Sequence, residues 1–181
     1  RNNIEIELYG ENFSQAYEKA LEECLKYNKT FIHPFDDKKV IEGQATLFLE
    51  IINQFKDDLD YLFIPIGGGG LISAAINVFK QLSPKTKIIG IEPKGAPSMY
   101  ESLKQNRLVS LKKIDGFADG VAVKKVGNIG FNLCNNYLDD IILIDENEIC
   151  NSIIELRTLE NIIVEPAGAL SSVCLRYFKD E

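Results

Sequence analysis

The chain has 181 residues, of which 45% are hydrophobic and 26% are charged, as in ordinary globular proteins. Its net charge of −7 argues against nucleic acid as the main partner, because that binding needs a clustered basic face. The apolar stretches fall short of the ~20 residues that cross a bilayer, and the first ten residues do not form a signal peptide pattern, so we expect a cytoplasmic protein.

The first part of the chain is predicted to contain two strands and two helices. Residues 4–8, IEIEL, alternate apolar and acidic side chains, which predicts a strand with one solvated face. Residues 13–25 carry apolar side chains at helical spacing, with Asn12 or Ser14 as the N-cap. Residues 30–35, TFIHPF, are expected to form a short strand, and the acidic pair that follows suits the N-terminus of a helix reaching residue 55.

From residue 61 onward, strands and helices alternate. Strands are expected at 61–66, 87–92 and 140–144, and helices at 71–82, 97–106, 127–137, 145–157 and from 165. Asp145 followed by Glu148 has the spacing of a capping box. The strands are apolar on both sides, which is typical of strands buried between two layers of helices. The predicted fold class is therefore α/β, a parallel sheet covered by helices on both faces.

The chain has one histidine and four cysteines, which lie far apart in the sequence. Their spacing fits no zinc motif, so we expect free thiols in a reducing compartment. His33 is predicted to be a residue at the end of a strand, before Pro34, rather than a catalytic group.

Four consecutive glycines, Gly67 to Gly70, join the strand at 61–66 to the next helix. A helix that starts this way presents unpaired N–H groups and the positive end of its dipole, which favours binding of an anion. A Walker loop is excluded, because no lysine follows at the required spacing. The dinucleotide fingerprint fits in part, with Glu92 placed as a ribose-binding acid, but Ile72 replaces its third small residue. A structural turn and a phosphate cup both remain open at this point.

The segment PIGGGGLISA resembles the tetraglycine phosphate loop of the serine/threonine dehydratase family, which are fold type II pyridoxal-phosphate enzymes of tryptophan synthase β-like architecture. HPFDDKKVIEGQAT, GFADGVAVKKVGNIGFNLCNNYLDDIILIDENEI and VEPAGAL are similar to family segments in the same order, so the resemblance covers nearly the whole chain. YGENFSQA, FADGVAVKKVG and EPAGAL are most similar to the biosynthetic threonine ammonia-lyases, rather than to the degradative enzymes or the racemases.

The resemblance implies pyridoxal 5′-phosphate as the cofactor. Main-chain N–H groups of the glycine loop would bind its phosphate, a glycine in ADG would pass beside the pyridine ring, and a glutamate in VEPAG would lie near the ring's far edge. The implied cofactor-binding residues are Gly67, Gly68, Gly69, Gly70, Leu71, Gly120 and Glu165. For Glu165, a structural role as an acid before Pro166 at a helix N-terminus is equally compatible. An aspartate at Gly68 is expected to place its carboxylate where the phosphate binds.

No metal is expected. The racemases of the family use an acid at the position of Glu92 together with a second acid six residues on, and here Ser98 occupies that second position. A single carboxylate is a poor site for a divalent cation.

The family's S-x-K-x-R-G segment, whose lysine carries the cofactor, and its S-x-G-N-H segment do not occur in this sequence. We therefore assign no catalytic residue and expect an inactive fragment. By the resemblance, residues 1–34 are the end of the small mobile domain and residues 35–181 are most of the large phosphate-binding domain. The N-terminal lysine segment and the C-terminal regulatory domain are expected to be missing. A transit peptide in that missing N-terminus would place the protein in an organelle matrix.

The activity implied for the intact enzyme is a lyase reaction, the conversion of L-threonine to 2-oxobutanoate and ammonia that begins isoleucine biosynthesis, a branched-chain amino acid pathway. Its partners would be an amino-acid substrate, threonine or serine, and further copies of itself in a homo-oligomer, with no nucleic acid and no membrane. The alternatives are a serine dehydratase or racemase of the same family, and a non-catalytic module that binds phosphate or a nucleotide.

Overall fold

The computed structural model describes residues 4–11, 13–55 and 59–178. The chain divides into two compact units, residues 1–33 and residues 34–181. None of the helices in these described ranges has the length and hydrophobicity of a membrane span. The assignment of the two units to a small mobile domain and a large domain stays a prediction.

The first unit contains helix α1 (Phe13–Lys26), as expected. Ser14 lies inside the helix, and Asn12 lies outside the described residues. The two strands expected near the start of the chain are wrong: residues 4–8 and 30–35 form no strand, and Ile6 is 81% exposed. A strand is stable only when a neighbour pairs with its N–H and C=O groups, and the described residues of this unit supply no such neighbour.

His33 lies among aromatic side chains of the first unit. Its ring centroid is 5.4 Å from that of Tyr17 and 6.0 Å from that of Phe31, both at edge-to-face angles. Because His33 is not in a strand, the expected strand-end setting is wrong, while a packing role fits its surroundings.

The second unit is built on a parallel sheet of three strands in the order β1-β2-β3. The strands are β1 (Tyr61–Pro65), β2 (Lys87–Pro93) and β3 (Asp140–Ile144), with Ile64 opposite Gly90 and Gly90 opposite Ile141. All three strands were expected from the sequence, and the α/β fold class is confirmed.

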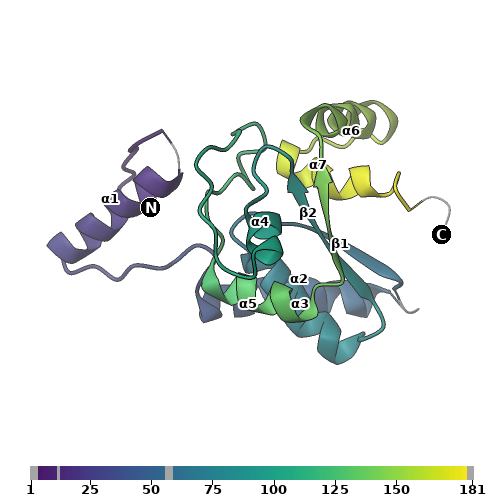
Figure 1. Ribbon diagram of the computed structural model, residues 1–181, viewed down its shortest axis with the longest axis horizontal. Helices are drawn as coiled ribbons and strands as arrows, with labels where there is room; N and C mark the ends of the chain where they lie inside the picture. The colour runs from purple at the N-terminus through teal and green to yellow at the C-terminus, as the bar shows by residue number, and fades with distance from the viewer. Residues whose placement is uncertain (1–3, 12, 56–58, 179–181) are drawn as a thin grey trace. The chain divides into compact units, whose positions relative to one another are not determined.

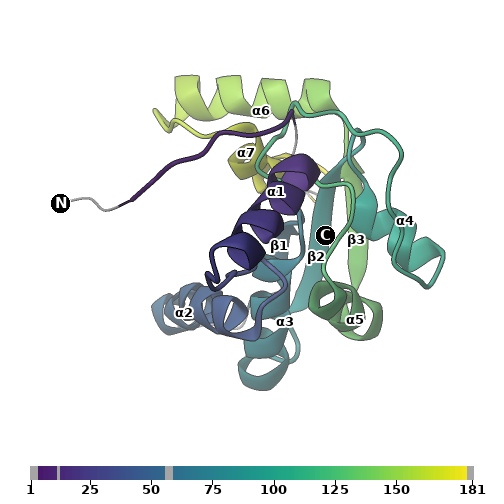
Figure 2. The same ribbon diagram turned by 90° about the vertical axis from the view of Figure 1, so that its left-hand side faces the viewer.

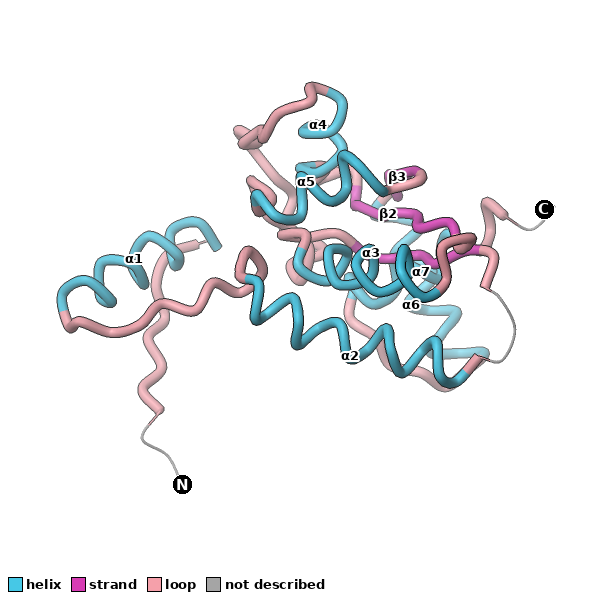
Figure 3. Tube along the Cα trace, turned by 90° about the horizontal axis from the view of Figure 1, so that it is seen from below, coloured by secondary structure: helices cyan, strands magenta, loops and turns pink. Residues whose placement is uncertain are grey.

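Helices cover both faces of this sheet (Figures 1 and 2). One face carries α3 (Gly70–Leu82), with α2 (Lys38–Gln54) alongside it (Figure 3) and α5 (Asn128–Tyr137) on its other flank. The short helix α4 (Ser98–Lys104) packs on α5. The opposite face carries α7 (Pro166–Cys174), with α6 (Glu146–Leu159) packed against it. Every helix expected in this unit is present.

The sheet separates two hydrophobic cores. The larger lies toward α2 and α3, where the rings of Phe48 and Phe79 meet edge to face at 6.2 Å. The smaller lies toward α6 and α7 and includes Ile91, Ile144 and Leu170. Because the strands are parallel, their carboxyl ends lie at one edge of the sheet, where ligands of open α/β folds bind.

Candidate functional site

The glycine loop lies at that edge, between β1 and α3. Gly69 is the N-cap of α3, has a φ of +95° and contributes no side-chain cap, and the first helical bond runs from the Ser73 N–H to the Gly69 carbonyl at 3.1 Å. No described residue accepts a hydrogen bond from the N–H groups of residues 67–71. Leu71 packs its side chain on the larger core. The loop therefore offers main-chain donors at the positive end of the α3 dipole, which suits an anion.

At each glycine of the loop, another part of the protein packs where a side chain would otherwise lie. A Cβ on Gly68 would overlap the ring of Phe35, and a Cβ on Gly70 would lie 3.0 Å from the Phe35 Cα. A Cβ on Gly67 would lie 3.0 Å from the Cα of Val121. The structure thus corrects the expectation for an aspartate at Gly68: its Cβ would enter the Phe35 ring, so the carboxylate would not simply replace a phosphate.

The third position of the run, Gly69, needs glycine for its conformation as well as for space. Its positive φ lies in the left-handed region, which side chains other than glycine rarely adopt. A Cβ there would also lie 3.2 Å from the Cα of Gly130, in the first turn of α5. The loop is therefore held between Phe35 on one side and the start of α5 on another.

Gly120 and Glu165 lie together beside the loop. A Cβ on Gly120 would be 3.2 Å from Oε1 of Glu165 and 3.0 Å from the Cβ of Ala167, and a Cβ on Gly67 would be 3.4 Å from the Gly120 carbonyl oxygen. The structure thus brings the sequence-predicted residues of the loop, the ADG turn and VEPAG to one place.

Glu165 is the N-cap residue of α7, with Pro166 in the first turn, as the structural interpretation expects. In the described chain, however, its side chain makes no cap hydrogen bond, and the residue is exposed. Its carboxylate is therefore not used by its own helix and lies against Gly120.

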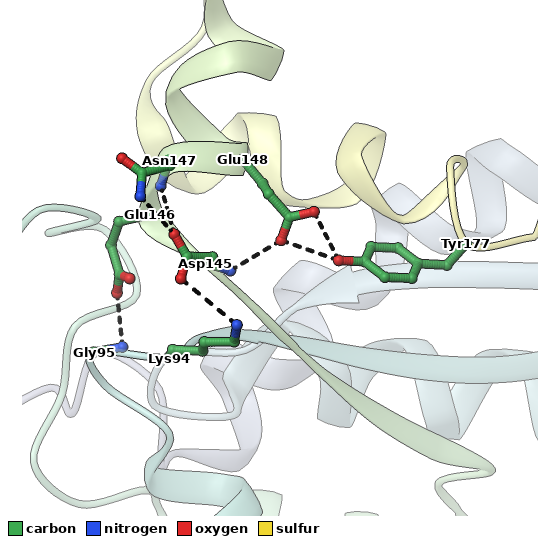
Figure 4. Close-up of polar contacts among 7 residues, drawn as sticks. All are labelled: Lys94, Gly95, Asp145, Glu146, Asn147, Glu148 and Tyr177. Atoms are coloured by element: carbon green, nitrogen blue, oxygen red, sulfur yellow. Dashed lines mark hydrogen bonds and ion pairs between the residues drawn. The ribbon is translucent and has the colours of Figure 1, made fainter.

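A polar cluster ties the end of β2 to the start of α6 (Figure 4). The Gly95 N–H donates to Oε1 of Glu146 at 2.7 Å, and Lys94 Nζ lies 3.6 Å from Oδ2 of Asp145. The predicted capping box is present, with the Asp145 N–H donating to Glu148 at 3.3 Å. The hydroxyl of Tyr177 also donates to Glu148, and this hydrogen bond raises the pKa of Tyr177.

The same cluster positions the turn that contains Gly120. The Asp115 N–H donates to the Gly95 carbonyl at 2.9 Å, and the Asp115 carboxylate accepts from the Phe117 N–H at 2.8 Å. The segment leading to Gly120 is therefore joined to the turn after β2 and, through Gly95, to the start of α6. Sequence reasoning identified the capping box but missed these contacts, because they join residues far apart in the chain.

Glu92, at the end of β2, is fully buried. Its Oε1 accepts from the Met99 N–H at 2.8 Å and the Ser98 hydroxyl at 3.5 Å, and its Oε2 accepts from the Tyr100 N–H at 2.8 Å. Burial raises its pKa to about 8, against the opposing effect of these hydrogen bonds. The carboxylate serves as the cap of α4, which leaves neither oxygen directed to a ribose.

No group of three or more histidine, cysteine, aspartate or glutamate side chains in the described part of the chain is arranged to hold a metal ion. Ser98, which stands where the racemases carry a second acid, donates to Glu92 instead of pairing with it as a ligand. The absence of a metal stays a prediction.

Comparisons with known proteins place these features in context. A family model described as pyridoxal-phosphate dependent enzyme matches residues 2–180. The chain is 49% identical, over 98% of its length, to the biosynthetic L-threonine dehydratase of Halalkalibacterium halodurans, and it spans 43% of that protein.

Solved structures agree. Threonine deaminase isoform 2 of Solanum lycopersicum, in its processed form, superimposes with a TM-score of 0.90 at 41% identity, covering 96% of this chain and 49% of that one. Serine racemase of Dictyostelium discoideum superimposes with a TM-score of 0.80 at 31% identity, covering 94% of this chain and 54% of that one. The chain therefore spans about half the length of the proteins it matches.

Proposed function

Since the chain belongs to the family of pyridoxal-phosphate dependent enzymes, we propose that it forms the phosphate-binding part of a threonine ammonia-lyase. The reaction of the whole protein would convert L-threonine to 2-oxobutanoate and ammonia, at the start of isoleucine biosynthesis. One observation carries the proposal: the open N–H groups of residues 67–71 lie beside Gly120 and Glu165, in a chain 49% identical to a biosynthetic L-threonine dehydratase.

The residues present fit pyridoxal phosphate. The loop has N–H donors for which the described residues supply no acceptor, at a helix N-terminus whose N-cap residue makes no side-chain hydrogen bond, as a phosphate dianion requires. Because Gly120 has no side chain, its main chain lies directly against the Glu165 carboxylate, and a flat ring bound here would border both residues. In this proposal Gly67, Gly68, Gly69, Gly70 and Leu71 bind the phosphate, and Gly120 and Glu165 border the ring.

The cofactor, when bound, would supply an electron-withdrawing ring that holds the electron pair released at the substrate Cα. The loop would anchor it through its phosphate, and the α3 dipole would favour the charge of that phosphate. Because Phe35 and Gly130 pack against the loop, the donors are held in place before the anion binds, which lowers the entropy lost on binding. The proton transfers are assigned to no residue of this chain, because the family's lysine segment is not in its sequence.

The proposal is tested with the full-length protein that contains this chain. We expect pyridoxal phosphate to bind and L-threonine to yield 2-oxobutanoate, measured by the absorbance of its hydrazone. L-serine and D-serine are assayed in parallel, so that serine dehydration or racemisation, the alternative within the family, is recognised by a higher kcat/KM on serine. Absence of pyridoxal phosphate binding would overturn the proposal. The predicted homo-oligomer is measured on the same sample by light scattering.

A further inference from the structure

Two adjacent aspartates, Asp36 and Asp37, cap two different helices. Oδ1 of Asp37 accepts from the N–H groups of Lys39 and Val40 at 2.8 and 3.1 Å, and so caps α2, the helix that it directly precedes. Asp36 acts on a helix that lies 92 residues further along the chain. The sequence offers the same side chain twice, but the structure uses each copy for a different element.

Asp36 caps α5 with both of its carboxylate oxygens. Oδ2 accepts from the main-chain N–H and the side-chain amide of Asn128, at 3.0 and 3.2 Å, and Oδ1 accepts from the Ile129 N–H at 2.8 Å. The N-cap residue of α5 is Gly127, which has no side chain that could accept a hydrogen bond from the first turn. The Asp36 carboxylate supplies that acceptor instead. A Cβ on Gly127 would lie 2.7 Å from the Asp36 carboxylate, which shows how closely the two segments approach.

The first turn of α5 is itself in contact with the glycine loop. The Gly127 N–H donates to the Gly68 carbonyl at 2.9 Å. A Cβ on Gly130 would lie 3.0 Å from both the Cα and the carbonyl oxygen of Gly69. The shape of the loop therefore depends on the position of the α5 N-terminus, which Asp36 holds.

We propose that Asp36 is a positioning residue for the phosphate-binding loop. It fixes the first turn of α5, this turn fixes the carbonyl of Gly68 and the path of Gly69, and the donors of residues 67–71 are thereby held in one arrangement. Phe35, the residue before it, contributes from the same segment by filling the space beside Gly68 and Gly70. This inference rests on the proposed function, because it takes the phosphate of pyridoxal phosphate as the anion.

The proposal is tested by comparing pyridoxal 5′-phosphate with pyridoxal, which lacks the phosphate, on the full-length apoprotein. Dissociation constants for both are measured by absorbance and fluorescence titration. In Asp36→Ala, the affinity for pyridoxal phosphate should fall by roughly three- to tenfold, the amount expected from loss of one helix cap, while the affinity for pyridoxal stays the same. Asp36→Asn keeps one acceptor oxygen and should fall in between.

Asp37→Ala is the matched control, because it removes the same carboxylate from the neighbouring cap. It should lower thermal stability without changing the preference for pyridoxal phosphate over pyridoxal. Equal losses of preference in Asp36→Ala and Asp37→Ala would overturn the positioning role, and so would an unchanged preference in Asp36→Ala. If Asp36→Ala does not fold, Asp36→Asn is assessed by the same criterion. If the wild-type protein shows no preference for the phosphorylated form, the proposed function fails as well.

Discussion

The helices α3 and α4 begin at the same edge of the sheet, each after a parallel strand, but their N-termini are satisfied in opposite ways. At α4, the buried carboxylate of Glu92 accepts from the first N–H groups of the helix. At α3, no described residue accepts from the N–H groups of residues 67–71. One helix start is filled by a carboxyl group of the protein itself, whereas no described group of the protein fills the other.

This difference shows that a helix N-terminus without a side-chain cap depends on packing from neighbouring segments to keep its shape. At α4, a side chain from the preceding strand holds the turn together. At α3 no described residue supplies such a side chain, and the loop is instead supported by Phe35, Val121 and Gly130, each of which closely approaches a glycine. The four glycines therefore reflect packing on one side of the loop, and the donors for a ligand are a separate property of its main chain.

The largest effect is expected from Gly68→Ala, which adds a methyl group where Phe35 already packs against the loop. Its methyl group would overlap the Phe35 ring, so we expect at least a hundredfold loss of pyridoxal phosphate affinity and a fall in unfolding free energy of about 1–3 kcal/mol. The sharper measurement is a double-mutant cycle with Phe35→Leu. Because the smaller side chain leaves room for the methyl group, Gly68→Ala should cost less in that background. An equal cost in both backgrounds would contradict the packing explanation.

The next effect is on stability alone, with none on ligand binding, and is expected from removing the carboxyl group that caps α4. Glu92→Leu leaves the N–H groups of Met99 and Tyr100 without their acceptor, and should lower the free energy of unfolding by about 2–4 kcal/mol. Glu92→Gln keeps the shape and one acceptor, and should cost about 1 kcal/mol. The preference for pyridoxal phosphate over pyridoxal should not change in Glu92→Gln. Denaturation curves and ligand titration of both variants check this prediction, and a lost preference would place Glu92 in the ligand site.

The smallest effect is a pH dependence of the unfolding free energy, which distinguishes the buried cap Glu92 from the exposed cap Asp145. The pKa of Glu92 is raised to about 8 in the folded protein, from an ordinary value of 4.5, so the folded state binds the proton more tightly. Its contribution to stability is fully present below about pH 4.5 and is lost as the pH rises through about 8. Between pH 6 and pH 8.5 the wild type should therefore lose more stability than Glu92→Gln, by about 1–2 kcal/mol.

Asp145, the cap of α6, should give a pH dependence of stability with the opposite sign. Its exposed carboxylate accepts from the Asn147 N–H, and this hydrogen bond lowers its pKa below the ordinary value of 3.8. Its contribution is thus present at neutral pH and is lost in acid. The destabilisation by Asp145→Ala should shrink toward pH 3, and melting curves that show the same trend for both caps would contradict the assignment.

The sequence predicts the second unit well because the relevant signals are local. The strand before the glycines, the helix after them and the box at Asp145 and Glu148 each follow from residues within a few positions of one another. The prediction is wrong at residues 4–8, since alternation describes a face of a strand but not the neighbour that a strand needs. It also could not separate Asp36 from Asp37, because both look suited to the helix that follows and the true partner of Asp36 is at Asn128.

The hydrogen bond from Asn128 to Asp36 also implies an order in which parts of the loop's surroundings can form during synthesis. The glycine loop leaves the ribosome well before α5, the helix whose first turn supports it, and contacts this distant in sequence form only when both partners are available. Until the chain has been extended through α5, Phe35 is available to the nascent loop but Gly127 and Gly130 are not. A polypeptide stalled between β2 and α5 would therefore carry the complete glycine motif without the native shape of the loop.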